Sequence, residues 1–253
     1  SWDSPWGPGR PGWHIECSVM STEILGDTID IHGGGADLEF PHHTNEIAQC
    51  EAKSGKTFGN YWMHNGFVNV DNEKMSKSLG NFVTVHDMLQ TVDGQVLRFF
   101  LATQQYRKPI NFTEKAIHDA EVNLKYLKNT HSLPLTEEVS QAELQAYLDA
   151  FQAAMDDDFN TANGVTVLFD MAKWINSGNY DETVKNAFEK ILQVFGIVFE
   201  EEVLDEDIEK LIEERQAARA NKDFATADRI RDELAAQGIK LLDTKEGVRW
   251  TRD

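Results

Sequence analysis

Three residues with metal-binding chemistry lie near the start of the chain: the thiol of Cys17, the imidazole of His42 and the carboxylate of Glu46. Zinc accepts sulfur, nitrogen and oxygen ligands, with sulfur and nitrogen preferred. If a helix begins at Pro41, where proline is tolerated, His42 and Glu46 lie one turn apart on the same face. Cys17 would then come from a separate strand or loop. The residue types and spacing therefore predict a candidate zinc site.

Two alternatives stay open for this set of residues. A cysteine near a histidine is also common as a small buried apolar residue beside an ordinary polar one. Cys50 follows Glu46 by four residues, would share its helix face, and competes as a ligand. Three protein ligands with an open position would suit catalysis or substrate capture, whereas four closed ligands would suit a structural role.

The elements that must position these residues begin with a strand and a glycine run. Residues 29–32 (IDIH) are typical of a short strand, and Gly33, Gly34, Gly35 and Asp37 follow. A strand, a glycine turn and a helix start often place a nucleotide at the strand's carboxyl end, where Asp37 could accept hydrogen bonds from ribose hydroxyls. The alternative is a tight turn with an N-capping aspartate.

A loop rich in lysine and serine follows a second strand-like segment. Residues 61–70 are apolar and aromatic, Asp71–Asn72 marks a turn, and residues 74–78 read KMSKS. Such a loop could close over a polyphosphate, with Lys77 as a point charge and the serines and backbone amides as donors. The alternative is a solvated surface loop.

From residue 93 onward, apolar residues recur at helical spacing. This pattern predicts a helical bundle over residues 93–200, in which Thr113 caps one helix. A charged helix is expected over residues 200–219 and a last helix from Phe224 to Gly238. Alternating residues over 239–250 predict a small hairpin.

Composition limits the function classes. The formal net charge is −19, which argues against a surface broadly adapted to nucleic acid, although it leaves room for a local basic face. Two cysteines cannot build a disulfide framework, and no apolar run has membrane-spanning length, so we expect a cytoplasmic location and no membrane contact. The chain opens on SWDSPWGPGRPGW without methionine, and we expect a piece of a longer protein.

Taken together, these motifs resemble the cysteinyl-tRNA synthetases, which belong to the class I aminoacyl-tRNA synthetases. KMSKS looks like the class signature, and residues 12–18 (GWHIECS) and 32–46 (HGGGADLEFPHHTNE) resemble the cysteinyl members. Residues 222–250 are similar to the family's C-terminal module. The resemblance covers almost the whole chain. It is far more specific than any single motif, because several long motifs occur in the family's order.

The resemblance implies an α/β plus mainly α fold. Residues 1–92 would form the C-terminal part of a Rossmann-like catalytic domain, with the zinc site and the KMSKS loop. Residues 93–200 would form a helical-bundle domain that binds the tRNA anticodon stem, and residues 201–253 a C-terminal module of helix and hairpin that recognises the anticodon. In one mild departure, residues 95–98 read QVLR where the family often has DALR.

The resemblance also implies roles for individual residues. Cys17, His42 and Glu46 match three ligands of the family's single zinc ion, and the fourth ligand is a cysteine that precedes this chain. Trp13 and His32 match residues that line the amino-acid pocket. Thr44 stands where the family usually has an acidic residue, and because it lies between ligands it should not abolish metal binding.

Nucleotide binding is implied for a second set. Gly33, Gly34 and Asp37 match the turn that contacts the ATP ribose. Lys77 matches the second lysine of the class signature, which assists ATP activation, and Lys74 matches the first.

The implied enzyme uses ATP with Mg²⁺ to form cysteinyl-adenylate, then transfers cysteine to tRNA(Cys), and is expected to be a monomer at full length. The HIGH signature does not occur in this chain, so we expect a fragment that is inactive alone. One alternative is a non-catalytic RNA-binding fragment. Another is a related ligase that joins cysteine to an amino sugar, which the helical bundle and terminal module disfavour. Candidate tRNA contacts are Arg219, Lys222, Arg229, Arg231, Lys240, Arg249 and Arg252.

Overall fold

The computed structural model describes residues 1–137, 139, 141–199, 206–244 and 247–252. Within these ranges the side chains of residues 77, 206, 207, 242–244, 247, 249, 251 and 252 are not described. The chain divides into two compact units, residues 1–199 and residues 200–253. Among the described residues, no helix is both long and apolar enough to cross a membrane.

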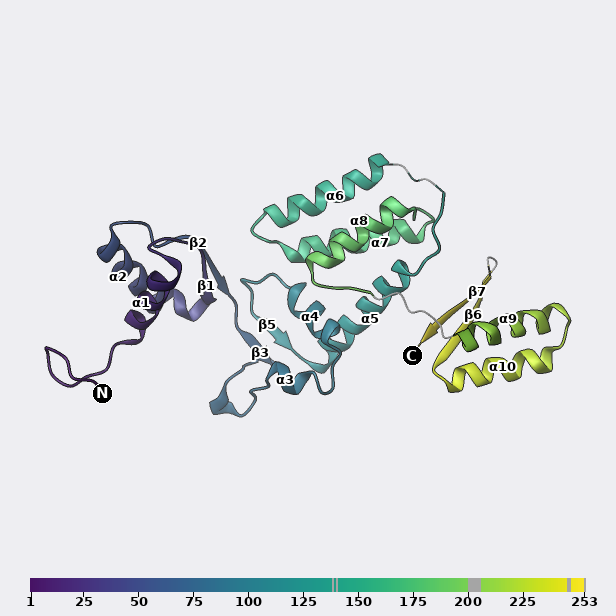
Figure 1. The fold of residues 1–253 in the computed structure, drawn as a ribbon, viewed down its shortest axis with the longest axis horizontal. Helices are drawn as coiled ribbons and strands as arrows, with labels where there is room; N and C mark the ends of the chain where they lie inside the picture. The colour runs from purple at the N-terminus through teal and green to yellow at the C-terminus, as the bar shows by residue number, and fades with distance from the viewer. Residues whose placement is uncertain (138, 140, 200–205, 245–246, 253) are drawn as a thin grey trace. The chain divides into compact units, whose positions relative to one another are not determined.

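The first unit opens with an α/β segment (Figure 1). Its elements in order are α1 (Trp13–Leu25), β1 (Ile29–Gly35), a 3-10 turn (Ala36–Leu38), a π-helical turn (Glu39–His43), α2 (Thr44–Ser54) and β2 (Gly59–Asn65). Strands β1 and β2 pair in parallel, from Ile29 opposite Gly59 to Gly35 opposite Asn65. Because α2 lies in the crossover between them, this is one β-α-β unit of the kind that builds nucleotide-binding sheets.

Cys17 lies on a helix, so the predicted strand or loop around it was wrong. The sequence from Trp13 to Leu25 contains no glycine or proline, and it is bounded by Gly12 and Gly26. Gly26 has a φ of 95°, a conformation that glycine adopts without steric cost and that ends the helix. The two glycines therefore delimit α1 rather than mark an irregular segment.

The glycine run is part of a strand rather than a turn. Gly33, Gly34 and Gly35 pair with Met63, His64 and Asn65 of β2, because ladder hydrogen bonds need only the backbone. A Cβ atom on Gly34 would lie 2.9 Å from Cε1 of His43, which is closer than real contacts allow. The missing side chain therefore lets an imidazole pack directly against β1.

The helix expected from Pro41 begins slightly later. The segment Glu39–His43 forms one π-helical turn in which Phe40 is extended and the Phe40–Pro41 peptide is cis, and α2 then starts at Thr44. The turn runs into α2 without a break, since the capping N–H of Thr44 donates to carbonyls of Glu39 and Pro41. His42 and Glu46 therefore keep the predicted one-turn spacing.

The KMSKS loop sits on a small second sheet. Its strands are β3 (Val68–Val70), β4 (Glu73–Lys74) and β5 (Ile110–Phe112), in the order β4-β3-β5. β3 pairs antiparallel with β4 and parallel with β5. The predicted turn between β3 and β4 is confirmed, because Asp71 and Asn72 both have positive φ. Helix α3 (Val85–Met88) follows the loop.

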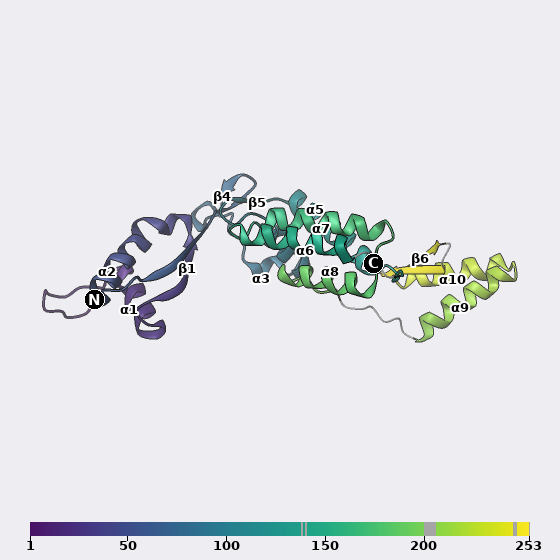
Figure 2. The same ribbon diagram turned by 90° about the horizontal axis from the view of Figure 1, so that it is seen from above.

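The rest of the first unit is a helical bundle, as predicted. Its helices are α4 (Gly94–Ala102), α5 (Glu114–His131), α6 (Gln141–Asp156), α7 (Thr161–Asn176) and α8 (Glu182–Val194). Helices α6, α7 and α8 lie side by side in both views (Figures 1 and 2). The bundle has one core, which includes Leu127 of α5, Leu168 of α7, Phe188 of α8 and Ile197, which follows α8. The predicted cap is present, since Thr113 accepts a hydrogen bond from the Ala116 backbone N–H.

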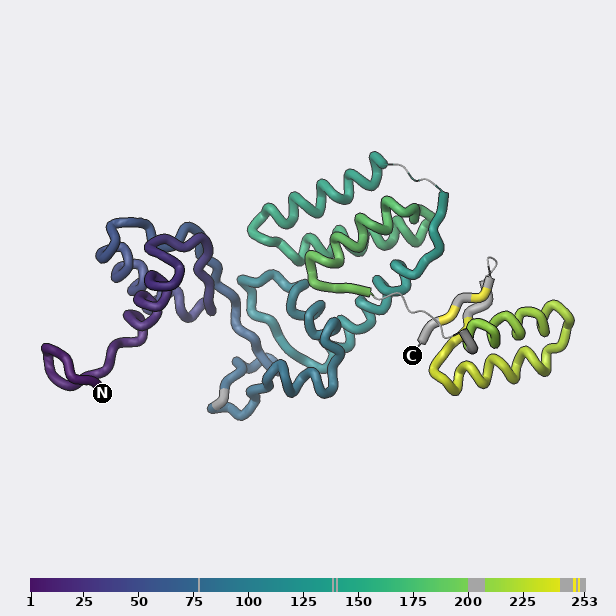
Figure 3. The backbone as a smooth tube through the Cα atoms, viewed as in Figure 1, coloured from purple at the N-terminus to yellow at the C-terminus, as the bar shows by residue number. Residues whose placement is uncertain are grey.

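The second unit is a helical hairpin followed by a strand hairpin. Its elements are α9 (Glu206–Ala220), α10 (Phe224–Ala236), β6 (Ile239–Thr244) and β7 (Gly247–Arg252). The trace in Figure 3 shows α9 and α10 running alongside each other. Ile208, Ile212, Ile230 and Leu234 pack together with Ile239, so the small core joins both helices to β6. The predicted last helix and hairpin are confirmed, and the start of the predicted charged helix, residues 200–205, lies outside the described residues.

Candidate metal centre and nucleotide-binding loop

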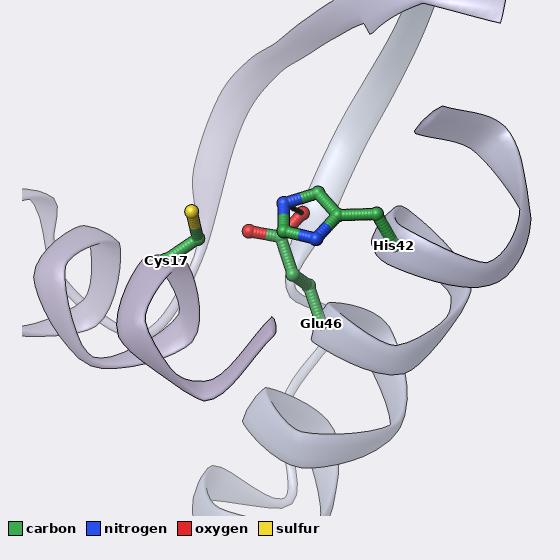
Figure 4. Close-up of side chains that lie close together, drawn as sticks. All are labelled: Cys17, His42 and Glu46. Atoms are coloured by element: carbon green, nitrogen blue, oxygen red, sulfur yellow. Dashed lines mark ion pairs between the residues drawn. The ribbon is translucent and has the colours of Figure 1, made fainter. Parts of the chain in front are cut away.

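Cys17, His42 and Glu46 converge on one point. Cys17 comes from α1, His42 from the π-helical turn and Glu46 from the first turn of α2, and their side chains point toward one another (Figure 4). One donor atom from each lies within 4.8 Å of the others. The two helices are held together nearby, because Ser18 Oγ donates to Gln49 Oε1 at 2.7 Å.

The donor set fits zinc in chemistry and in burial. A thiol, an imidazole and a carboxylate together are a zinc ligand set, and three such ligands leave a position open. Glu46 is only 1% exposed, His42 is buried and Cys17 is half-buried. Burial raises the pKa of the Cys17 thiol, and the nearby carboxylates of Glu46 and Glu16 raise it further. A divalent cation would offset both the buried negative charge and this cost of forming a thiolate.

Glu46 is surrounded by imidazoles. Its Oε2 lies 3.0 Å from His32 Nε2, 3.7 Å from His42 Nε2 and 3.9 Å from His43 Nε2. Burial, followed by the charges of His32, His64 and His42, lowers the pKa of His43 to about 4. His43 is therefore neutral near pH 7 and does not neutralise the carboxylate. His32, His43 and Glu46 form a second converging group, which shares Glu46 with the first.

Cys50 does not join this cluster. Among the described residues, the converging donor groups contain Cys17 and not Cys50. The Cys50 thiol is buried, packs in a small core with Ile29 and Phe58, and points at the Ser18 carbonyl at 3.8 Å. Burial is the main cause that raises its pKa. Cys50 thus behaves as a small core residue, and the competing-ligand alternative loses support.

The two residues predicted to line an amino-acid pocket adjoin the cluster. Trp13 stacks on His42 with ring centroids 4.3 Å apart, and the indole is 58% exposed. His32 comes from β1 and contacts Glu46. Both residues therefore touch a candidate ligand, with Trp13 on the side of His42 and His32 on the side of Glu46.

The residues predicted to contact a nucleotide lie at the carboxyl end of β1. Gly33 and Gly34 are in the last part of the strand, and Asp37 is exposed in the 3-10 turn that follows. In parallel α/β sheets this edge is where ligands bind. The ribose contact stays a prediction, and its residues lie at a strand end rather than in a glycine turn.

The KMSKS loop is a structured segment. Lys74 is exposed, and its Nζ lies 4.0 Å from the centroid of the Phe67 ring. Lys77 begins a 3-10 turn, and its side chain lies outside the described residues. Asn81 closes the loop, because its Oδ1 accepts from the Ser76 backbone N–H at 2.8 Å and its Nδ2 donates to the Lys74 carbonyl at 3.2 Å.

Sequence reasoning missed three residues that shape these sites: Trp62, His64 and Asn81. Trp62 and His64 are two apart on β2, so they share a strand face, and their rings are nearly parallel at 6.3 Å. Period-two alternation against the exposed Tyr61 is the signal that could have identified them. Asn81 gave no such signal, because its role depends on the loop folding back on itself.

The chain matches three family models in succession. Residues 1–122 match the tRNA synthetases class I (C) catalytic domain, residues 150–200 the DALR domain, and residues 201–250 the cysteinyl-tRNA ligase anticodon binding domain. Over its whole length of 253 residues it is 97% identical to a cysteine–tRNA ligase of Streptococcus thermophilus strain CNRZ 1066. The chain belongs to the cysteinyl-tRNA synthetase family. It is also 84% identical to a cysteine–tRNA ligase of Streptococcus pyogenes serotype M6.

The chain spans 57% of the length of each of these two relatives. A crystal structure of a putative arginyl-tRNA synthetase from Campylobacter jejuni has a similar fold, with a TM-score of 0.55 and 14% identity over 77% of this chain and 53% of that one. The predicted fold class, part of a class I catalytic domain followed by a helical anticodon-binding region, is confirmed. The predicted domain boundaries at residues 92 and 200 stay predictions.

The candidate tRNA contacts in the C-terminal part of this family member differ in their surroundings. Arg231 pairs with Asp228 and Asp232 at 3.0 Å, and Arg229 lies 3.6 Å from Glu233. The side chains of Arg249 and Arg252 lie outside the described residues. Because the paired arginines are already partly neutralised, RNA phosphates would have to compete with neighbouring carboxylates for them.

Proposed function

We propose that this chain is part of a cysteine–tRNA ligase, an enzyme that activates cysteine with ATP and transfers it to tRNA(Cys). The observation that carries the proposal is the convergence of Cys17, His42 and Glu46 in a chain that also contains the KMSKS loop and belongs to this family. Location in the cytoplasm and a monomeric full-length protein remain part of the proposal.

Selection of cysteine is assigned to the cluster around Glu46. When bound to Cys17, His42 and Glu46, a zinc ion would supply a sulfur-preferring Lewis acid that favours a thiol over the hydroxyl of serine. The indole of Trp13, stacked on His42, and the imidazole of His32 would bound the side of the pocket where the amino acid is held. With cysteine bound, both rings would shield that side from water, which would strengthen polar contacts inside it.

ATP binding is assigned to the strand end and the loop. Gly33 and Gly34 would let the nucleotide approach the backbone of β1, and Asp37 would accept hydrogen bonds from the ribose hydroxyls. Lys77, with Lys74, would stabilise the negative charge that develops on the phosphates while the cysteine carboxylate attacks the α-phosphate, with Mg²⁺ as the accompanying cation. The helical bundle and the C-terminal unit would bind the tRNA.

The metal assignment is tested by elemental analysis of the 253-residue chain and two variants. We expect near-stoichiometric zinc in the parent chain and in Cys50→Ala, and loss of most of it in Cys17→Ser. Cys50→Ala is the matched control because it removes the other thiol outside the cluster. Equal zinc in Cys17→Ser and the parent chain would contradict the assignment.

The catalytic assignment is tested by ATP–pyrophosphate exchange with cysteine. We expect exchange from a full-length protein that contains this sequence, and a large loss in its Lys77→Ala variant. The isolated 253-residue chain, which contains no HIGH motif, is expected to give none. Exchange that depends on a substrate other than cysteine, or full exchange in Lys77→Ala, would overturn the proposal. Transfer to tRNA(Cys) rather than to an amino sugar separates it from the related small-molecule ligase.

A further inference from the structure

One aromatic side chain next to the candidate metal centre has no role in the function proposed so far. Trp62, on β2, stacks against His32 with ring centroids 4.7 Å apart and planes inclined by 28°. The same indole lies 5.3 Å from the ring of His43 and nearly parallel to that of His64. Its ring neighbours are thus three imidazoles and Phe58, and the indole also packs against the small core that contains Ile29 and Cys50.

The indole itself is held in a defined orientation. Trp62 Nε1 donates a hydrogen bond to the Gly59 carbonyl at 3.2 Å. A Cβ atom on Gly59 would lie 3.1 Å from the indole, which is tighter than most real contacts, so the bare Cα of Gly59 makes room for the ring. Phe58 is fully buried, and the centroid of its ring lies 6.1 Å from that of the indole. The ring therefore rests on its own strand and cannot easily tilt.

The contacts continue from the indole to the candidate ligand. His32, stacked on Trp62, has its Nε2 at 3.0 Å from Glu46 Oε2. His43, on the same indole, shares a hydrogen bond of 2.8 Å between its Nδ1 and His64 Nε2. An imidazole turns readily about its Cβ–Cγ bond, because this torsion has only broad preferences. The stacked contact of His32 and the tilted contact of His43, whose ring plane is inclined by 47° to the indole, restrict that freedom before any ligand binds.

We propose that Trp62 is a positioning residue, whose indole fixes the rings of His32 and His43 and, through His32, orients the Glu46 carboxylate. It touches neither metal nor substrate. The proposal rests on the proposed function only in treating Glu46 as a metal ligand. Groups that hold a ligating side chain typically change metal affinity by about 10- to 100-fold when they are replaced. Trp62 would act one contact further out, through the ring of His32.

The test compares Trp62→Leu with Trp62→Phe in the 253-residue chain. Leucine removes the aromatic face, whereas phenylalanine keeps a ring that can stack. Tyr61→Leu is the matched control, because Tyr61 is the neighbouring aromatic on β2 but is 70% exposed. The first readout is the histidine ring ¹⁵N spectrum of the metal-free chain at one fixed pH, which reports the tautomer of each imidazole. The second is Zn²⁺ affinity, measured by competition with a chromophoric chelator, and thermal unfolding is recorded in parallel.

We expect His32 in the parent chain to hold its proton on Nε2, facing Glu46, and to show mixed tautomers in Trp62→Leu. Zn²⁺ affinity should fall about tenfold in Trp62→Leu, recover in Trp62→Phe and stay unchanged in Tyr61→Leu. If Trp62→Leu lowers the melting temperature but leaves both the His32 tautomer and Zn²⁺ affinity unchanged, Trp62 only packs, and the proposal is overturned. A Trp62→Phe variant as impaired as Trp62→Leu would overturn it as well.

A second variant guards against simple misfolding of Trp62→Leu. Gly59→Ala keeps the indole but places a methyl group against it, so we expect the same shift in the His32 spectrum. An unchanged spectrum in this variant counts against the proposal. The spectrum is read without metal or activity. If the parent chain binds no Zn²⁺, the metal assignment fails, while the positioning role of Trp62 is still decided by the His32 tautomer.

Discussion

The side-chain oxygen of Asn81 accepts a hydrogen bond from the backbone N–H of Ser76 at 2.8 Å. With the bond from its Nδ2 to the Lys74 carbonyl, this one side chain holds the first half of the KMSKS segment against the residue that follows the loop. Ser76 Oγ in turn accepts from the Leu79 N–H at 3.3 Å. The loop therefore presents its second lysine from a backbone that is already folded on itself.

Replacing Asn81 by alanine should loosen this loop. Loss of two hydrogen bonds worth about 1 kcal/mol each predicts roughly tenfold or greater acceleration of amide exchange at Ser76. Hydrogen–deuterium exchange of the loop peptide measures this, with Asn72→Ala as a comparison that removes a different contact, the one between Asn72 and Asn111. Unchanged exchange at Ser76 in Asn81→Ala would show that the loop is held by other contacts.

Asp181 should stabilise the bundle through two backbone contacts. Its Oδ1 accepts from the Val184 N–H, capping α8, and its Oδ2 accepts from the Val139 N–H. Because a lost cap costs about 1 kcal/mol and a second, partly buried donor is left unpaired, Asp181→Ala should lower the free energy of unfolding by about 2 kcal/mol. Chemical denaturation measures this. Asp119→Ala, which breaks only an exposed pair with Lys115, should change it by less than about 1 kcal/mol.

The effect of Asp181 should depend on pH. Burial alone would raise the pKa of this carboxyl, but hydrogen bonds from the N–H groups of Val184, Val139 and Thr183 outweigh it and lower the pKa below 3.8. A lowered folded-state pKa means that the stabilisation is fully present above pH 3.8 and is lost as the pH falls through the folded value. The difference between the parent chain and Asp181→Ala should therefore shrink in acid. A difference that stays constant down to pH 2 would refute this account.

Tyr180 gives the opposite pH dependence. Its hydroxyl donates to the His131 carbonyl at 2.8 Å in the buried core. Burial, followed by the charges of Glu189 and Glu182, raises its pKa above the usual value of 10.0. A raised folded-state pKa contributes stability that is present below pH 10.0 and is lost as the pH rises further.

Tyr180→Phe should therefore cost about 1 kcal/mol near pH 7, because one buried hydrogen bond is lost. The cost should diminish above pH 10. There the tyrosine ionises in the unfolded parent chain but stays protonated in the folded one, which favours the unfolded state. Urea unfolding at pH 7 and pH 11 measures both values, and Tyr61→Phe, on an exposed side chain, serves as the control. An equal cost at both pH values would count against the buried hydroxyl as the cause.

Gly66 should tolerate no side chain. A Cβ atom there would lie 2.3 Å from the Lys108 carbonyl carbon, which is backbone and cannot move aside as a flexible side chain would. The Gly66 N–H also donates to the Tyr106 carbonyl at 2.7 Å. Gly66→Ala should destabilise the chain by about 3 kcal/mol, the upper range for overpacking. Urea unfolding of the variant measures this. Gly9→Ala, with open space around it, should be nearly neutral in the same measurement.

The helices of the bundle could be predicted because their apolar residues repeat every three to four positions and face one core. Helix α1 could not, because Val19, Met20 and Ile24 are exposed and leave no apolar stripe on one side. The glycines of β1 were misread for a different reason. Glycine is locally typical of turns, but pairing with β2 gives these residues a partner that lies about thirty positions away.

In the candidate site, too, some residues could be predicted from the sequence and others could not. The residue types of Cys17, His42 and Glu46 predict a metal site, and their convergence keeps that prediction open to direct test. The ring contacts of Trp62 and the loop-closing bonds of Asn81 depend on how β2 and the loop fold in space. Neither residue belongs to a motif. The alternation along β2 marks Trp62 as an inward-facing residue but does not reveal its ring partners, and Asn81 gives no local signal at all.

The pairing of β3 with β5 also bears on how the chain folds as it is synthesised. Val68 pairs with Ile110, so the strand that leads into the KMSKS loop finds its parallel partner 42 residues later (110 minus 68). Chains emerge from the ribosome at about 5 to 20 residues per second, and distant pairings form only after the intervening chain is available. For some seconds, then, a nascent chain holds the complete KMSKS sequence without the sheet that supports it. However fast its local turns fold, the loop acquires its supporting sheet only after α4 and β5 have been synthesised.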